Sequence, residues 1–188
     1  MSFNEQNFLT RLDSLITGDG FRQVQEVKMS EWKTAAGLTL TASTAPTMAA
    51  LETSFYGVQS ASSTTDLGSL AFTVPEDYDS DSDELRLRFL CNSAGTTDEP
   101  ILTATLYTKR EGVALATKTG VDSAAVSKTS ATTGATWTEI DLDGLSLLPG
   151  DAVFAVLTIG AHTTDAINFY GVELIYRSNL AFTDPNDR

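Results

Sequence analysis

The sequence is poor in the residues that build disulfide, metal or redox chemistry. Its 188 residues include one cysteine, Cys91, and one histidine, His162. A lone cysteine has no partner for an internal disulfide, so the chain encodes no disulfide framework. A zinc site usually requires several Cys or His ligands, which these two residues do not supply. We expect Cys91 to be a small buried hydrophobic residue, and we expect no metal or other cofactor.

Positive charge is also scarce. Lys and Arg number 12 against 25 Asp and Glu, which gives a formal net charge of −13. Proteins that bind nucleic acid need clustered basic side chains to displace counterions from the phosphates, so we expect no nucleic-acid partner. The same negative field disfavours anionic membrane surfaces and favours solubility or docking onto basic partners.

Long apolar runs are missing as well. No segment approaches the roughly 20 apolar residues that cross a bilayer. The first residues, MSFNEQ, lack the basic and apolar blocks of a signal peptide. We therefore expect no membrane partner, and we expect synthesis in a cytoplasm with function there or inside an assembly that leaves it.

No catalytic motif stands out from chance. A Ser-His-Asp triad would have to use His162, but residues 160–165 read as a polar hairpin-like loop. Ser30–Lys33 and Lys118–Gly120 mimic two boxes of serine β-lactamases, yet the chain is too short for that fold and its pattern is β rather than helical. Neither a phosphate-binding glycine loop nor a dinucleotide fingerprint is present. We expect the protein not to be an enzyme, with no catalytic, cofactor-binding or metal-ligating residues.

What the sequence does contain is an alternation of apolar and polar residues from residue 70 onward. A period of two is typical of strands with one face in a core and the other in water. Turn signals such as Asp143-Gly144 and Pro149-Gly150-Asp151 separate the alternating segments. The expected strands lie at 70–74, 85–91, 102–107, 113–117, 121–126, 137–142, 152–159 and 167–177. About eight short strands predict a mostly β protein, an antiparallel β-sandwich of jelly-roll type.

Two of these segments allow finer predictions. Residues 152–159 are apolar on both faces, which predicts a central strand. Gly171 interrupts the last strand, and a glycine inside a strand marks a β-bulge or a close approach of another backbone.

The first residues of the chain predict a short helix. Between residues 2 and 17 the apolar positions recur at steps of three and four: Phe8, Leu9, Leu12, Leu15 and Ile16. Ser2 and Glu5 have the spacing of a capping box, and Gly18 follows the pattern as a stop. So short a helix is marginal alone in water, so its apolar face needs a partner. That partner is either the chain's own sandwich or a neighbouring subunit or host surface.

Residues 34–65 carry a single charge, Glu52. The segment reads either as strand and loop at the edge of the sandwich or as an extended arm that orders on a partner. We expect Trp32, just before it, to anchor the segment by burying its ring. The chain is therefore divided into a helix and arm over residues 1–68, for docking or oligomerisation, and a sandwich over residues 69–188.

The densest charge cluster is residues 76–84, with six acids among nine residues. Calcium prefers several carboxylate oxygens from one loop. The EF-hand pattern would need Gly and Glu where this chain has Ser82 and Arg88, so that pattern fails. We interpret the acidic loop Asp77–Asp83 as a solvated connection between two strands, with calcium binding as the alternative.

Several of these segments together resemble a known family. They are residues 72–79 with a Pro-x-Asp-Tyr loop, residues 85–87, residues 147–151 with a Pro-Gly-Asp turn, and residues 171–176 ending in an aromatic residue. Residues 69–178 are in this respect similar to β-sandwich structural proteins of tailed bacteriophages. The resemblance implies a virion component made in the host cytoplasm, either a capsid decoration (cement) protein or a head or tail spike module. The family has no catalytic residues to carry over.

Two classes of function follow. The main expectation is a capsid decoration protein that binds the major capsid protein at the capsid surface, stabilises the head shell and forms a homo-oligomer, with a closed trimer favoured. The alternative is a carbohydrate- or receptor-binding module of a virion spike or tail. Such a module would use exposed aromatic rings, with Trp137, Tyr107 and Tyr170 as candidates, unless these residues belong to the core or an interface.

Overall fold

The computed structural model describes residues 21–52, 55–81, 84–126 and 134–179. The strands are β1 (Phe21–Val27), β2 (Thr47–Glu52), β3 (Phe55–Ser60), β4 (Asp66–Thr73), β5 (Leu85–Ser93), β6 (Ile101–Lys109), β7 (Ala116–Ala125), β8 (Thr136–Asp141), β9 (Ala152–Ile159) and β10 (Ile167–Ser178), with a 3-10 turn η1 (Met29–Glu31) after β1. In these ranges no helix has the length and apolarity that crossing a membrane requires.

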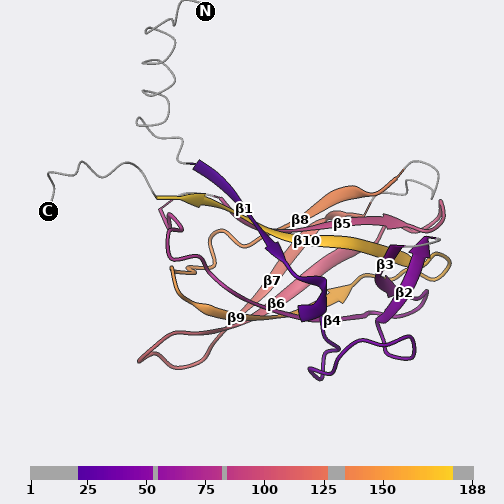
Figure 1. The fold of residues 1–188 in the computed structure, drawn as a ribbon, viewed down its shortest axis with the longest axis horizontal. Helices are drawn as coiled ribbons and strands as arrows, with labels where there is room; N and C mark the ends of the chain where they lie inside the picture. Colours follow the sequence, from indigo (N-terminus) through magenta and orange to yellow (C-terminus); the bar gives the residue numbers. More distant parts are fainter. Residues whose placement is uncertain (1–20, 53–54, 82–83, 127–133, 180–188) are drawn as a thin grey trace, which may run out of the picture.

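Strands β3 to β10 form two four-stranded antiparallel sheets that pack face to face (Figure 1). These eight strands have the order β3-β10-β5-β8 in sheet A and β4-β9-β6-β7 in sheet B, and sheet A also includes β2, which pairs with β3, and β1, which pairs with β10. The sheets meet where Ser123 of β7 pairs with Ile140 of β8. This strand order is that of a jelly roll, so the predicted antiparallel jelly-roll-like sandwich is confirmed.

The core lies between the sheets and is built by the predicted alternation. Strand β5 shows it most plainly, with Leu85, Leu87, Phe89 and Cys91 fully buried and the three residues between them partly exposed. Burial raises the pKa of the Cys91 thiol to about 11, so Cys91 is the buried apolar residue that the sequence predicts. Strand β9 lies between β4 and β6, which confirms that it is a central strand.

One expectation about the strands was wrong, and one strand was missed. Residues 113–117 and 121–126 are not separate strands, because one strand, β7, spans Ala116–Ala125 and Val113 and Leu115 lie exposed in the turn before it. Strand β1 was not predicted at all. Four of its seven residues are polar, and it pairs along β10 rather than filling a core. The predicted helix over residues 2–17 lies outside the described residues.

Strands β2 and β3 place much of residues 34–65 at the edge of sheet A, with β3 on β10 and β2 outermost. Trp32 anchors the start of this segment as predicted. Its indole N–H donates to the Leu67 carbonyl at 2.6 Å, and its ring packs on Phe89 and Phe169 with centroids 5.8 and 5.2 Å away. The neighbouring backbone approaches closely, because a Cβ at Gly68 would lie 2.1 Å from the Lys33 carbonyl oxygen.

Gly171 marks a β-bulge, as the sequence predicts. The pairing of β10 with β5 shifts register between Phe169 and Gly171, which leaves Tyr170 as the extra residue.

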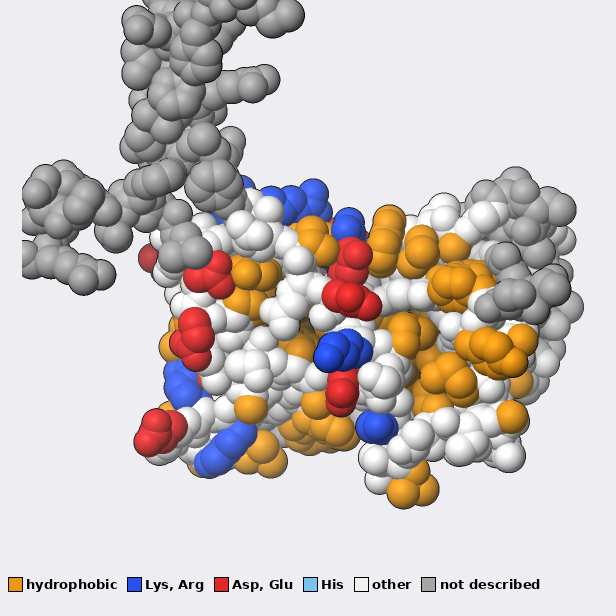
Figure 2. All heavy atoms as spheres, in the orientation of Figure 1, with side chains coloured by type: hydrophobic (Ala, Val, Ile, Leu, Met, Phe, Trp, Pro, Cys, Tyr) orange, Lys and Arg blue, Asp and Glu red, His pale blue; other side chains and the backbone are white. Residues whose placement is uncertain are grey.

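On the face shown in Figure 2, acidic and basic side chains line the middle and apolar side chains gather towards the β2–β3 end.

We predict that Trp32→Phe lowers the free energy of unfolding by about 1–3 kcal/mol, because the buried Leu67 carbonyl loses its donor. Trp137→Phe is the matched control, since that ring lies at the surface, and should change stability by less than about 0.5 kcal/mol. Urea denaturation of both variants measures the difference. Equal losses would show that the Trp32 hydrogen bond contributes nothing specific.

Candidate binding face

The motifs of the loop 75–78, the turn 149–151 and the end of β10 meet at one corner of the sandwich. The Val74 N–H donates to the Asp151 carbonyl at 2.9 Å, and the Gly150 N–H donates back to the Val74 carbonyl at 3.0 Å. The Asp77 carboxylate accepts hydrogen bonds from the hydroxyls of Tyr176 and Ser178, at 3.1 and 2.5 Å. Burial, together with this bond to Asp77, raises the pKa of the Tyr176 phenol. These motifs bind one another and hold the corner together.

Asp151 makes a second structural contact in the same turn. Its buried carboxylate accepts two hydrogen bonds from the Arg110 guanidinium, at 2.5 and 2.7 Å, and a third from the Leu148 N–H at 3.0 Å. The bonds from Arg110, assisted by that from Leu148, hold the pKa of Asp151 below its usual range. Arg110 thereby ties the β6–β7 turn to the Pro-Gly-Asp turn.

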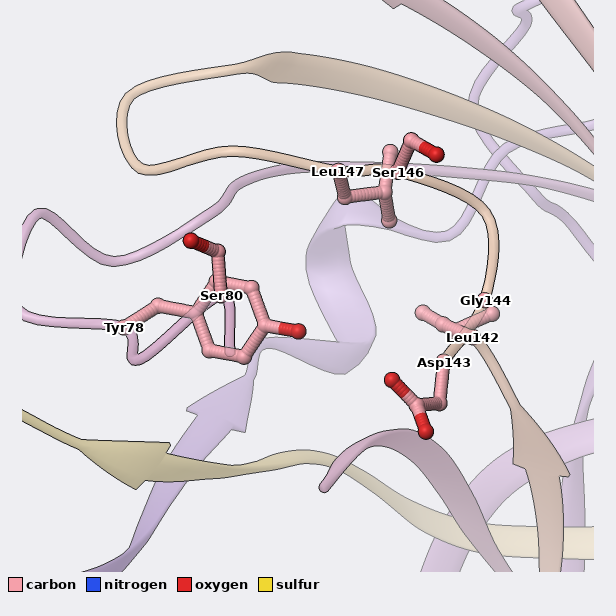
Figure 3. Close-up of a pocket in the computed structure, with 7 residues that line it drawn as sticks. All are labelled: Tyr78, Ser80, Leu142, Asp143, Gly144, Ser146 and Leu147. Atoms are coloured by element: carbon pink, nitrogen blue, oxygen red, sulfur yellow. The ribbon is translucent and has the colours of Figure 1, made fainter. Parts of the chain in front are cut away.

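The acidic loop borders a hollow of about 240 Å³. Figure 3 shows the Tyr78 hydroxyl and the Asp143 carboxylate directed into it from two different loops. The carboxylate of Asp79 instead accepts the Asp81 N–H at 3.1 Å. Among the described residues, which leave out 82 and 83, no group of three His, Cys, Asp or Glu side chains is placed to hold a metal ion. The described part of the loop offers no preformed calcium site.

His162 is buried and joins two loops. Its Nδ1 lies 2.9 Å from the Gly160 carbonyl oxygen, and its Nε2 lies 3.0 Å from the Ala61 carbonyl oxygen and 3.2 Å from the Ser60 hydroxyl. Each of these neighbours is a hydrogen-bond partner within the fold. The side chain therefore has a structural role that accounts for its position.

Asp98 and Asp165 fasten the neighbouring loops by the same means. The Asp98 carboxylate accepts the Thr164 and Asp165 N–H groups at 2.7 and 2.8 Å, and these bonds hold its pKa below the usual range. The Asp165 carboxylate accepts the Thr97 and Asp98 N–H groups at 2.7 and 3.0 Å. Each aspartate thus caps the loop that carries the other.

The three aromatic candidates divide between the two outer faces. Trp137 on β8 and Tyr170 on β10 belong to the outer face of sheet A, whereas Tyr107 on β6 belongs to that of sheet B. Trp137 is 40% exposed and Tyr107 36%, and Tyr170 is half-buried. The structure therefore brings two of the three candidates onto one face.

On sheet A the apolar side chains form a strip that runs across four strands. Trp137 of β8 stands opposite Leu90 of β5, which stands opposite the bulge of β10. At the bulge, the Tyr170 ring packs on Phe55 of β3 with centroids 5.4 Å apart. We call Trp137, Leu90, Tyr170 and Phe55 the aromatic strip. Phe55, 46% exposed, was missed by sequence analysis, because only the strand register places it beside Tyr170.

A charged row borders the aromatic strip on one side. The Arg88 guanidinium lies 4.3 Å from the centroid of the Trp137 ring. Its Nε donates to the Glu173 carboxylate at 2.7 Å, which fixes the guanidinium in place. Arg88 therefore covers one face of the indole and holds the ring in a defined orientation.

An amide row borders the aromatic strip on the other side. Asn168 pairs with Gln59 on β3 and with Asn92 on β5. The Gln59 side-chain amide donates to the Asn168 side-chain carbonyl at 2.9 Å. Asn92 is 2% exposed, and its Oδ1 has no hydrogen-bond partner among the described residues.

Sheet B carries a second aromatic patch of different character. Tyr107 of β6 stands directly opposite Phe154 of β9. The two belong to the lining of a shallow hollow of about 430 Å³, together with Ala71, Phe72, Thr73, Lys109, Leu115, Ala152 and Val153. Most of this lining is apolar, in contrast to the mixed aromatic and amide surface of sheet A.

No protein-family model matches the chain, and no curated protein matches it. Solved structures that show some likeness to the chain include three β-rich modules. A xylan-binding module CBM15 is 15% identical over 83% of this chain and 97% of its own, with a TM-score of 0.48. The CBM22-1–GH10 modules of the Clostridium thermocellum endo-1,4-β-D-xylanase 10B, complexed with xylohexaose, are 14% identical over 87% of this chain and 28% of that one, with a TM-score of 0.45.

The third is the CBM2 module of the evolved Dit of Lactobacillus casei BL23 phage J-1. It is 10% identical over 84% of this chain and 97% of its own, with a TM-score of 0.33. Similarity this low leaves the fold and the site to be argued from the chain's own strand order and side chains.

We predict that Asp151→Asn lowers the free energy of unfolding at pH 7 by about 1–3 kcal/mol, because a charge-assisted pair is lost. The stabilising effect of a carboxylate with a lowered pKa is present above about pH 4 and is lost as pH falls through that lowered pKa. The difference in free energy of unfolding between wild type and variant should therefore disappear below about pH 4. Denaturant titrations from pH 7 down to pH 2.5 measure it.

The control for this experiment is Glu111→Gln, which neutralises an exposed acid next to Arg110. Its stability should follow that of the wild type at every pH. A gap for Asp151→Asn that stays constant with pH would contradict the assigned role of Arg110.

Proposed function

We propose that the protein is a non-catalytic carbohydrate-binding module whose glycan binds the outer face of sheet A. The observation that carries the proposal is the aromatic strip lying beside the amide row. This arrangement places exposed rings beside a row of side-chain amides, of which Gln59 is partly exposed while Asn168 and Asn92 are buried.

These two kinds of contact match the two surfaces of a sugar ring. The C–H bonds on a sugar face carry partial positive charge, which the negative face of an aromatic ring attracts. The hydroxyl groups at the sugar's edge both donate and accept hydrogen bonds. A side-chain amide offers a carbonyl acceptor and an NH₂ donor, and Gln59 is the partly exposed member of the amide row that offers them.

The rings are also held in advance of binding. Trp137 is fixed by Arg88, and Tyr170 is fixed by its packing on Phe55. Side chains that are already ordered lose little conformational freedom when a ligand docks, which favours affinity. The net charge of −13 opposes polyanionic ligands, so the proposal is restricted to neutral glycans.

We predict that Trp137→Ala weakens glycan binding about tenfold, because one stacking surface and its cation–π neighbour are lost. Native gel electrophoresis in the presence of xylan, mixed-linkage β-glucan or a neutral bacterial cell-wall polysaccharide measures binding as retardation. Tyr107→Ala is the matched control, because it removes an aromatic ring of similar exposure from the opposite sheet. An equal loss of glycan binding in Tyr107→Ala, or full binding by Trp137→Ala, would contradict the assignment of the binding face to sheet A.

A second candidate function is capsid decoration, with the major capsid protein as partner and the virion surface as location. It is supported by the loop 75–78, the turn 149–151 and Tyr176, the motifs that carry the resemblance to phage structural proteins, which meet at one corner. If this function is correct, the protein should cosediment with empty phage capsids in a ratio set by the capsid lattice. Failure to cosediment while binding of a polysaccharide persists would leave the carbohydrate-binding function alone.

A further inference from the structure

The charged row contains an ion pair, Arg88 with Glu173, that lies in direct contact with the aromatic strip. We propose that Glu173 is a specificity-determining residue of the glycan-binding face, because it occupies the Arg88 guanidinium and thereby keeps out sugars that carry a carboxylate. Removing the charge of Glu173 opens the face to uronic acids. This inference deepens the proposed function and rests on it.

Strand register brings the two side chains of the pair together. Glu173 of β10 stands opposite Arg88 of β5. The Nε and Nη2 atoms of Arg88 lie 2.7 and 2.5 Å from the same carboxylate oxygen of Glu173. The Arg88 side chain is 20% exposed and that of Glu173 is 25% exposed. Water therefore screens this pair less than it screens a fully exposed one, while both groups stay within reach of a ligand.

Arg88 is placed to meet the acid group of a sugar that binds at Trp137. The guanidinium carbon lies 4.3 Å from the centroid of the Trp137 ring, and Trp137 is 40% exposed. A sugar that stacks on the open part of this ring therefore lies close to Arg88. The planar N–H groups of a guanidinium match the geometry of a carboxylate. Without Glu173, Arg88 would be a receptor for the carboxylate of a uronic acid.

Glu173 opposes a carboxylate ligand in two ways. Its carboxylate takes the Nε and Nη2 donors of Arg88 that a second carboxylate would need. It also holds a negative charge beside the place that the second carboxylate would occupy, and like charges repel strongly at short range. Repulsion of an unwanted ligand is a general means of specificity. A neutral sugar meets no such repulsion, because its hydroxyl groups can donate to Glu173.

A second ion pair in the charged row provides a matched comparison. Arg86 of β5 lies 3.2 Å from Glu139 of β8, and these side chains are 36% and 33% exposed. In the part of the chain that the structure describes, Arg88 and not Arg86 lies over the Trp137 ring. Neutralising Glu139 changes the net charge as much as neutralising Glu173 does. Any difference between the two variants therefore reports the contact at Trp137 rather than the overall charge.

The test compares the full wild-type chain with Glu173→Gln in native gels that contain either xylan without acid groups or xylan substituted with glucuronic acid. Glu173→Gln should bind the acid-bearing polymer about tenfold more tightly than the wild type does, because Arg88 gains a charge-assisted hydrogen bond. Its affinity for neutral xylan should be unchanged. The gain should shrink as salt is added, since the charges are partly exposed.

Three control variants show whether the gain comes through Arg88. Glu139→Gln should bind both polymers as the wild type does, and so should Glu173→Asp, which keeps the charge. Glu173→Gln combined with Arg88→Gln should lose the gain. A general disturbance of the face would weaken binding of both polymers rather than favour the acidic one. No gain in Glu173→Gln, or an equal gain in Glu139→Gln, would overturn the proposal.

The same gels separate failure of this inference from failure of the proposed function. A wild type that binds neutral xylan, with no gain in Glu173→Gln, would contradict the role of Glu173 and leave the proposed function standing. A wild type that binds neither polymer, with a gain in Glu173→Gln, would support that role and exclude neutral xylan as the ligand. Tighter binding of the acid-bearing xylan by the wild type would contradict both this inference and the restriction to neutral glycans.

Discussion

The pairing of β10 on both of its edges is the constraint on which most of the molecule depends. Along one edge β10 pairs with β5 through nearly its whole length, and along the other it pairs with β3 and then with β1. Its inward side chains face the core and its end closes the corner at Asp77. The bulge at Tyr170 is the single interruption in its pairing with β5, and it places that ring beside Phe55 on the outer face. The strand that joins the N-terminal and C-terminal parts of the sheet therefore also shapes the candidate site.

Much of the fold could be predicted from the sequence, because a core demands apolar residues at alternate positions. Strands β5, β6 and β10 follow that alternation, whereas β9 was predicted because it is apolar on both faces. Strand β1 does not, because backbone pairing to β10 holds it and its side chains are mostly exposed. Val113 and Leu115 were misplaced for the opposite reason, since they alternate like a strand but lie in a turn that Arg110 ties to Asp151. The alternation of apolar residues reports which strand face is buried. It therefore fails to predict strands where backbone pairing or a turn determines the conformation.

The candidate site could be predicted only in part. Residue type identifies Trp137, Tyr107 and Tyr170 as aromatic, but not which of them share a face. The register across β8, β5 and β10 decides that question. The amide row is harder still, since Gln59 and Asn168 are 109 positions apart in the chain and meet only through pairing of β3 with β10. Cooperating residues on neighbouring strands leave no local signal in one sequence.

The distribution of polar contacts separates the parts of the molecule that hold the fold from the part that is available to a partner. The carboxylates of four aspartates accept hydrogen bonds from other groups of the same chain: Asp77, Asp98, Asp151 and Asp165. The outer face of sheet A differs, because Trp137 and Phe55 of the aromatic strip are exposed there. The carboxylates hold the loops in place, and the exposed rings of the outer face are held instead by Arg88 and by ring packing.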